Sequence, residues 1–197
     1  MKHFKNFKTC VYCTAQTLAS LDETTLARDY AYLEKYVGID KVYLETYRDG
    51  TWVAIDHMKM IQNFFKKHGV EIAGGITTVT PPLEKDDVKR QRLFQTFCYS
   101  NEAMRTYLKK IVTYTAELFD EIILDDFFFT SCTCDDCLRE RSNLSWAEFR
   151  SKKMIDVAEN LVLKPAKLAN PSVKVTIKYP NWRESYHETG YVPKIQP

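Results

Sequence analysis

Hydrophobic residues along this chain alternate between two spacings, and the alternation repeats from one end to the other. Short runs rich in β-branched and aromatic residues predict strands at residues 8–16, 41–47, 70–79, 121–129 and 173–179. Between them, apolar residues recur every three or four positions, which predicts amphipathic helices over 22–37, 54–68, 101–118 and 146–164. Asp22, Ser100 or Asn101, and Ser145 stand where helix N-caps are expected, and Gly69 stands where a helix should end.

Strands that alternate with helices in this way predict a parallel sheet with right-handed crossovers. The first strand is not followed by a glycine-rich phosphate loop, which argues against a nucleotide-binding open sheet. We therefore expect the α/β class and a (β/α)₈ TIM barrel. Such a barrel needs about 250 residues. Residues 1–197 are then expected to be a single domain, the N-terminal portion of a barrel truncated to about its first five βα units. A smaller open sheet, complete at this length, is the alternative.

Composition narrows the class of partner. The chain is 45% hydrophobic and carries 28 Lys and Arg against 26 Asp and Glu, so a globular domain without a phosphate-binding surface is expected. Nucleic acid is therefore not an expected partner. Aromatic residues make up 13% of the chain, and their flat faces suit either sugar stacking or ordinary core packing.

The chain contains no apolar stretch of about 20 residues that would predict a membrane span. Its first residues, MKHFKNFKTC, also lack the apolar segment of a signal peptide. A soluble protein is expected. A periplasmic or secreted protein whose signal peptide had been removed would look the same, so localisation stays open, as does the oligomeric state.

Four of the six cysteines fall in a pattern typical of a metal site. Cys98 follows the third predicted strand, and Cys132, Cys134 and Cys137 follow the fourth in a C-x-C-x-x-C cluster. Neighbouring parallel strands bring these two loops together, and four thiolates form the tetrahedron that Zn²⁺ prefers. We predict a structural zinc ion, with disulfides or buried free thiols as the alternatives. The remaining two, Cys10 and Cys13, are expected to be core residues on the first strand.

The cysteine pattern and its surroundings resemble the zinc-containing β-galactosidases, a family of barrel-type glycoside hydrolases. The resemblance rests on Cys98 in FCYSNEAMRTYLKK, the trio in SCTCDDC, and Trp146 with Phe149 in SWAEFRSKK, and it covers residues 95–150 well. It implies a carbohydrate substrate. In that family the fourth strand ends in Asp-Asn-Glu with the glutamate as acid/base catalyst, whereas this chain has LDDFFF and places Phe127 at that position.

The departure from Asp-Asn-Glu means either that a neighbouring carboxyl group has taken the acid role or that the β-galactosidase mechanism does not apply to this chain. Hydrolysis of a glycosidic bond needs a pair of carboxyl groups. Since neighbouring strand residues point to opposite faces, one of Asp125 and Asp126 is expected in the barrel mouth. We favour Asp126 as the catalytic acid, because it is nearer the strand end, and expect Asp125 to orient a neighbour. The other carboxyl group is expected beyond Pro197. Simple capping of the following loop by the two aspartates is the competing interpretation.

Polar and aromatic residues follow two other predicted strands at the same edge of the sheet. They suit hydroxyl recognition and ring stacking. The candidate substrate-binding residues are Glu45, Tyr47, Arg48, Lys178, Tyr179 and Trp182. Taken singly, each could equally be a solvated loop residue.

Three functions are compatible with these patterns. The leading hypothesis is a glycoside hydrolase using acid/base catalysis, which in this truncated form could be inactive alone. The second is a non-catalytic carbohydrate-binding pseudoenzyme with a structural zinc site, which the loss of Asp-Asn-Glu favours. The third, a zinc-stabilised interaction module that binds nucleic acid, is disfavoured by the balanced charge.

Overall fold

The structure is a computed structural model that describes residues 4–80, 93–179 and 189–191. Its centre is a parallel sheet in the order β1-β2-β4-β5-β6, with each strand beside the next parallel strand along the chain. The strands are β1 (Cys10–Cys13), β2 (Lys41–Arg48), β4 (Glu71–Ile76), β5 (Glu121–Leu124) and β6 (Lys174–Ile177). A short strand, β3 (Thr51–Trp52), pairs antiparallel with β2. The predicted parallel order of the strands is therefore confirmed.

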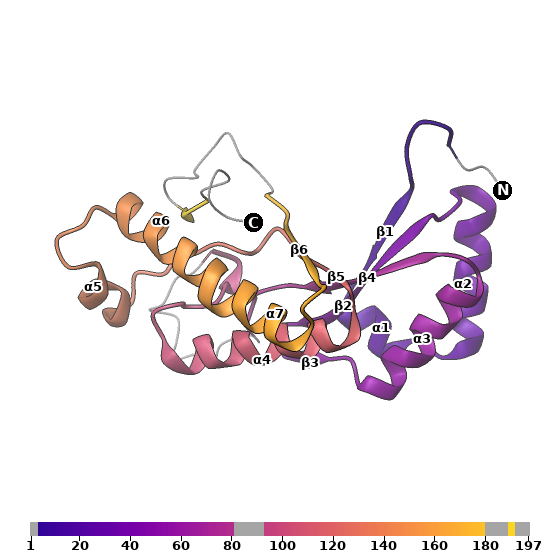
Figure 1. The fold of residues 1–197 in the computed structure, drawn as a ribbon, viewed down its shortest axis with the longest axis horizontal. Coiled ribbons are helices and arrows are strands. Elements are labelled where there is room, and N and C mark those ends of the chain that lie inside the picture. The colour runs from indigo at the N-terminus through magenta and orange to yellow at the C-terminus, as the bar shows by residue number, and fades with distance from the viewer. Residues whose placement is uncertain (1–3, 81–92, 180–188, 192–197) are drawn as a thin grey trace.

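Helices connect the strands, and Figure 1 shows α4 and α7 side by side below β5 and β6, with α2 and α3 beside the β1 end. The elements are α1 (Ala15–Ser20), α2 (Glu23–Tyr36), α3 (Ile55–Lys67), α4 (Glu102–Leu118), α5 (Asp135–Arg141), α6 (Trp146–Val157) and α7 (Lys164–Ala169). One strand face, including Val42, Leu44, Ile122 and Leu124, is fully buried against this helical layer. The result is an α/β fold with the architecture of a partial barrel.

The predicted helix starts are confirmed by side-chain caps. Asp22 accepts from the Thr25 amide at 2.7 Å, and Asn101 accepts from the Met104 amide at 3.1 Å. Ser145 forms a capping box with Glu148, in which each side chain bonds the other residue's backbone amide. Gly69, at φ 73°, follows α3 as the expected left-handed residue.

Several boundaries differ from the predictions. The strand predicted over 121–129 ends at Leu124 and gives way to a turn. The helix predicted over 146–164 is longer, because α6 continues through a π-helical segment, Ala158–Leu163, into α7. Pro165, which has no N–H to donate, lies in the first turn of α7, directly after the π-helical segment. The helices α1 and α5 were not predicted.

The expectation that Cys10 lies in the core is wrong. Cys10 is exposed, since β1 is the edge strand of the sheet in the described part of the chain. Cys13 is half-buried and packs against the apolar residues between the sheet and the N-terminal helices. Burial raises the pKa of the Cys13 thiol to about 11, so this thiol is neutral at pH 7.

Candidate active site and metal centre

Oppositely charged side chains meet where β2, β5 and β6 end. Asp125 is buried and is held between two cations: its Oδ2 lies 3.2 Å from Nη2 of Arg48, and its Oδ1 lies 3.1 Å from Nζ of Lys178. Nζ of Lys178 also lies 2.8 Å from Oδ1 of Asp126. The structure thus brings four of the predicted site residues into one charged network.

Glu45 extends this network inward from β2. Its side chain is fully buried, and Nε of Arg48 donates to its two carboxylate oxygens at 2.9 and 3.1 Å. The Tyr12 hydroxyl donates to Oε1 at 2.8 Å, the Ala15 amide donates to Oε2 at 2.7 Å, and the Thr77 hydroxyl donates to Oε1 as well. With both oxygens engaged inside the protein, Glu45 organises the strand ends.

Asp125 and Asp126 do not alternate across a strand. Since β5 ends at Leu124, both carboxylates reach the same Lys178 ammonium, and the expectation that only one of them could point to the mouth is wrong. They differ in exposure: the Asp126 side chain is 34% exposed, against 11% for Asp125. The Asp126 carbonyl accepts from the Tyr191 hydroxyl at 3.0 Å, which anchors the turn.

The network shifts the pKa values of its cations and of one phenol. Hydrogen bonding to Asp126 raises the pKa of Lys178 despite partial burial. Burial by itself would lower the pKa of Arg48, but its bonds to Glu45 outweigh this and raise it. Burial and the nearby Glu45 charge raise the pKa of Tyr12 far above its usual value. Both cations are therefore charged at neutral pH, and Tyr12 stays a neutral donor.

The remaining predicted site residues lie in different settings. Tyr47 is fully buried among aromatic rings, and its hydroxyl donates to the Val79 carbonyl at 3.1 Å, so it packs in the core. Tyr179 is half-buried, and its ring centroid lies 5.0 Å from the ring centroid of Tyr191. Burial raises the pKa of Tyr179 to about 12. Trp182 lies outside the described residues. The sequence analysis missed Tyr12 and Thr77, whose roles depend on contacts across the sheet.

The four cysteines predicted to bind a metal come together at one point. The Sγ atoms of Cys98, Cys132, Cys134 and Cys137 all lie within 4.8 Å of one another. The Cys98 sulfur is 3.7 Å from those of Cys134 and Cys137, and these two are 3.8 Å apart. Hydrogen bonds with Cys137 and Cys98 lower the pKa of the Cys132 thiol. The cluster, which is covered by Phe149 and Met104, can hold a metal ion.

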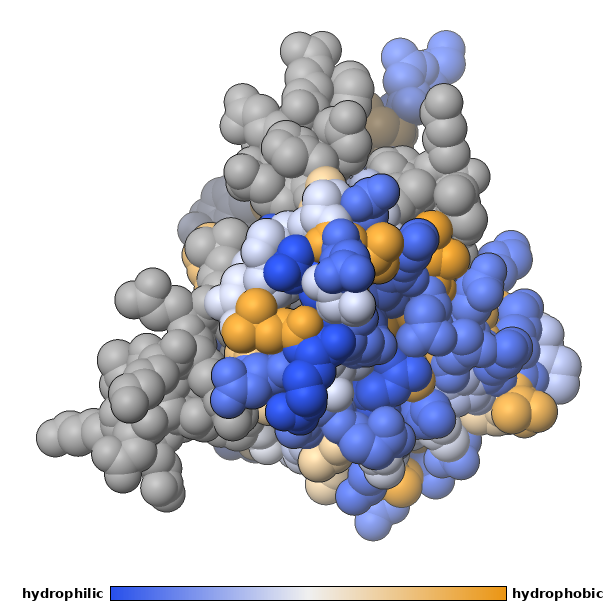
Figure 2. Space-filling model, turned by 90° about the vertical axis from the view of Figure 1, so that its left-hand side faces the viewer, coloured by the Kyte–Doolittle hydropathy of each residue, from blue (hydrophilic) through white to orange (hydrophobic). Residues whose placement is uncertain are grey.

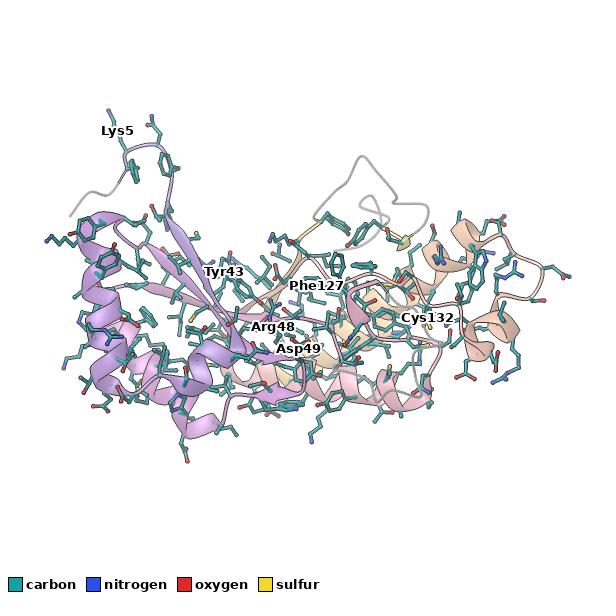
Figure 3. All side chains as sticks on the ribbon, turned by 180° about the vertical axis from the view of Figure 1, so that it is seen from behind. Lys5, Tyr43, Arg48, Asp49, Phe127 and Cys132 are labelled. Carbon is teal, nitrogen blue, oxygen red and sulfur yellow. The ribbon has the colours of Figure 1, made fainter. Side chains whose placement is uncertain are left out.

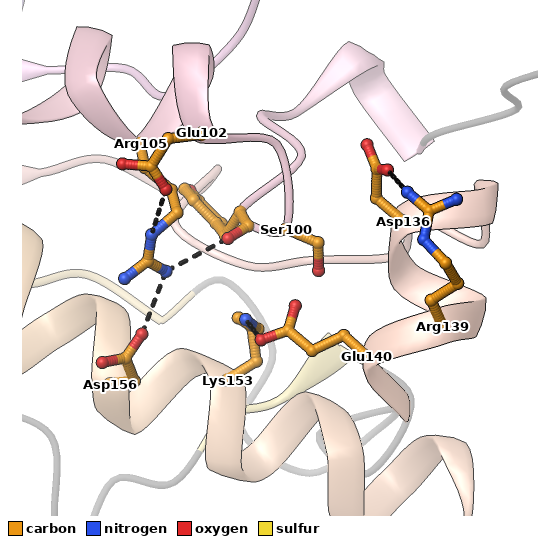
Figure 4. Close-up of a pocket in the computed structure, with 9 residues that line it drawn as sticks. Ser100, Glu102, Arg105, Asp136, Arg139, Glu140, Lys153 and Asp156 are labelled. Atoms are coloured by element: carbon orange, nitrogen blue, oxygen red, sulfur yellow. Dashed lines mark hydrogen bonds and ion pairs between the residues drawn. The ribbon is translucent and has the colours of Figure 1, made fainter. Parts of the chain in front are cut away.

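A polar cavity of about 570 Å³ lies beside the cysteine cluster, between the start of α4 and the helices α5 and α6 (Figure 4). Nη1 of Arg105 lies 3.0 Å from Oδ2 of Asp156, and the buried Lys153 ammonium pairs with Glu140. Figure 2, which views the molecule from this end, shows a mostly hydrophilic surface with scattered apolar side chains. These ion pairs tie the cysteine-bearing segment to α4 and α6.

Among the helices of the described residues, none is long and apolar enough to cross a membrane.

Comparisons with known proteins indicate the family to which the chain belongs. The family described as "Probable glycosyl hydrolase, catalytic domain" matches residues 1–197. An uncharacterized protein of Saccharolobus solfataricus is 32% identical over 210 residues, covering 94% of this chain and 34% of that protein. The α-L-fucosidase isoenzyme 2 of Paenibacillus thiaminolyticus has a similar fold, with a TM-score of 0.61 at 12% identity over 86% of this chain and 32% of the fucosidase.

The chain spans about a third of the length of these two proteins. The similarity to the fucosidase structure concerns the fold alone, and it agrees with the mostly parallel sheet and its connecting helices. The family match covers the whole chain. We conclude that the chain belongs to the family of probable glycosyl hydrolase catalytic domains.

Proposed function

We propose that the protein hydrolyses glycosidic bonds in a carbohydrate substrate, with Asp126 as the general acid. The observation that carries this proposal is the network at the ends of β2, β5 and β6, which leaves one carboxyl group, that of Asp126, partly exposed beside a cation. Active sites of barrel enzymes are assembled at this edge of the sheet. A general acid needs such access to the leaving oxygen.

Asp125 acts as a positioning residue in this proposal. It fixes the Arg48 guanidinium and the Lys178 ammonium from either side. Lys178 is half exposed, so its ammonium can turn from Asp126 to a sugar hydroxyl while it stays bound to Asp125. With the ammonium turned away, the Asp126 carboxylate can take up a proton from solvent and pass it to the leaving oxygen.

Glycoside hydrolysis also needs a second carboxyl group on the other side of the scissile bond. Glu45 is fully buried and Asp125 is paired with two cations, so the proposal assigns this role to neither. The first carboxyl group can be tested without knowing the second.

The test compares substitutions at Asp126 and Asp125 in the full-length protein. Asp126→Asn should lower turnover of glycosides with poor leaving groups by about 10²-fold or more, and should affect activated aryl glycosides less, because those need little protonation. Asp156→Asn is the matched control, since that side chain is 40% exposed and likewise pairs with a cationic side chain, that of Arg105, but lies in the α6 helix.

Two outcomes would redirect the proposal. Unchanged turnover in Asp126→Asn with lost turnover in Asp125→Asn would exchange their roles. If the unaltered protein bound glycosides but hydrolysed none of them, the carbohydrate-binding alternative would replace catalysis, in line with Phe127 at the position where the β-galactosidases that the chain resembles have their glutamate.

We further propose that the four cysteines bind a structural zinc ion, as in the zinc-containing β-galactosidases. Four sulfurs about 2.3 Å from a tetrahedral zinc ion lie about 3.8 Å apart, which matches the separations of 3.7 and 3.8 Å in the cluster. Four sulfur ligands leave no open position for water, so the ion would join the loops after β4 and β5 and take no part in catalysis.

Metal analysis of the purified protein should find about one zinc ion per chain. Cys134→Ser should lower this content and the melting temperature, whereas Cys10→Ser, at an exposed cysteine outside the cluster, should change neither. A metal-free protein with a disulfide between any two of the four cysteines would refute the zinc site.

A further inference from the structure

A second cavity opens beside the charged network and is lined differently from it. Its volume is about 350 Å³, and its walls come from the end of β2, the segment after β4 and the turn after β5. The lining residues are Arg48, Asp49, Val79, Phe94, Gln95 and Phe127. Two aromatic rings, a carboxylate, an amide and a guanidinium thus face one small space.

Phe94 and Phe127 form an aromatic wall of this cavity, and Phe94 is strongly exposed. The Phe94 side chain is 63% exposed, and its ring contacts the edge of the Phe127 ring at 5.4 Å between centroids. The Arg48 guanidinium lies 5.7 Å from the centroid of the Phe127 ring. A flat apolar face is therefore presented next to polar groups, which is the combination that binds a sugar ring by stacking and hydroxyl bonds.

The backbone that carries this wall is strained. Phe94 and Gln95 have φ angles of 53° and 55°, in the left-handed region that residues with a Cβ rarely adopt. The segment is held there by Thr80, whose amide and hydroxyl donate to the Gln95 carbonyl at 3.0 and 3.1 Å, and by the Phe97 amide, which donates to the Thr78 carbonyl at 3.0 Å. Strain of this kind is retained mainly at functional sites.

The cavity adjoins the proposed catalytic carboxyl group. Arg48 lines the cavity and bonds Asp125, and Phe127 directly follows Asp126. The Thr78 hydroxyl donates to the Phe127 carbonyl at 2.6 Å and fixes the turn from the other side. Figure 3 shows Arg48, Asp49 and Phe127 close together near the middle of the molecule, with Cys132 farther along.

We propose that this cavity is a subsite for one neutral sugar ring, which stacks on Phe94 and offers its hydroxyls to Asp49 and Gln95. The charge of the cavity disfavours acidic sugars. The single positive charge of Arg48 is already shared by Glu45 and Asp125, so it does not balance the negative charge that the Asp49 carboxylate adds to the cavity. A uronic acid would be repelled, whereas a neutral pyranose would not. The inference rests on the proposed carbohydrate substrate.

The test measures binding separately from turnover. Methyl pyranosides of neutral sugars (glucose, galactose, mannose, xylose and fucose), and methyl glucuronide and galacturonide as acidic probes, would be titrated into the full-length protein and followed by saturation-transfer NMR. Phe94→Ala should weaken binding of the best neutral probe about five- to tenfold. Tyr32→Ala is the matched control, because Tyr32 is 65% exposed but lies on α2, and it should leave binding unchanged.

A second variant tests the charge argument. Asp49→Asn should narrow the preference for neutral over acidic probes while keeping the aromatic wall. Equal binding of neutral and acidic probes by the unaltered protein, no binding of any probe, or unchanged binding in Phe94→Ala would each overturn the subsite. Because this test reads binding and the Asp126→Asn test reads turnover, failure of the subsite is distinct from failure of the catalytic proposal.

Discussion

The Arg48–Glu45 pair offers a quantitative test of how the strand ends are held together. Glu45 is fully buried and the Arg48 side chain is 19% exposed, so the two charges interact largely away from water. Arg48→Met keeps most of the apolar side-chain volume but removes the cation. A buried carboxylate is then left without its partner, in a setting where its desolvation is no longer offset.

The expected cost follows from the remaining contacts of Glu45. Breaking a buried ion pair by removing one partner costs about 3–5 kcal/mol. Glu45 keeps donors from Tyr12, Ala15 and Thr77, which places the loss near the lower limit, about 3 kcal/mol. For a chain of this length that corresponds to a fall in melting temperature of about 6–12 °C.

Denaturant unfolding of a double-mutant cycle would measure this loss. Glu45→Gln removes the buried charge, so the double variant with Arg48→Met should be about 2 kcal/mol more stable than Arg48→Met alone. Arg28→Met serves as the control, since Arg28 is exposed and pairs with its neighbour Asp29 at the surface, and it should leave the free energy of unfolding essentially unchanged.

The reasoning fails if Arg48→Met costs less than about 1 kcal/mol while adding Glu45→Gln brings no recovery. That result would mean that Glu45 and Arg48 are solvated in solution, and that the strand ends are open.

Three further predictions concern other parts of the fold. Gln95→Gly should raise the free energy of unfolding by about 1 kcal/mol, because glycine adopts a positive φ without strain; a lower melting temperature in calorimetry would contradict this. Burial alone would raise the pKa of Glu140, but the bond from Lys153 outweighs it and lowers this pKa. The ionised Glu140 should therefore stabilise the fold by at most about 1 kcal/mol at pH 7, and this contribution should disappear as the pH falls below about 4. Glu140→Gln should remove it. Equal losses at pH 7 and pH 3 would exclude that contribution. Gly75→Ala should destabilise the protein by about 1–3 kcal/mol, because the new Cβ would stand 2.7 Å from the Tyr12 hydroxyl that bonds Glu45, and a chemical denaturation curve unchanged from the parent would refute it.

Local patterns in the sequence were sufficient for the order of the five parallel strands and for the clustering of the four cysteines. The helix starts at Asp22, Asn101 and Ser145 follow from side chains that bond amides three residues ahead, and such contacts depend only on nearby residues. The spacing of Cys132, Cys134 and Cys137 likewise lets one loop supply three sulfurs.

Tertiary structure decided what these patterns could not. The strand before Asp125 ends at Leu124, since the turn there is fixed by bonds from Thr78 and Tyr191, which lie far away in the sequence. Apolar residues continue through this turn, so hydrophobicity predicted a strand where the backbone had already left the sheet.

The same reason explains the charged network and the cavity beside it. In the sequence, Glu45 and Tyr47 are both polar residues at a strand end. Partners from other elements give Glu45 a buried position with several hydrogen bonds, and they place Tyr47 in the core. Phe94 reads as an ordinary apolar residue, and only its clamped, left-handed backbone exposes its ring. A sequence specifies short-range geometry through contacts between neighbours, whereas burial and pairing across a sheet depend on which distant residues the fold brings together.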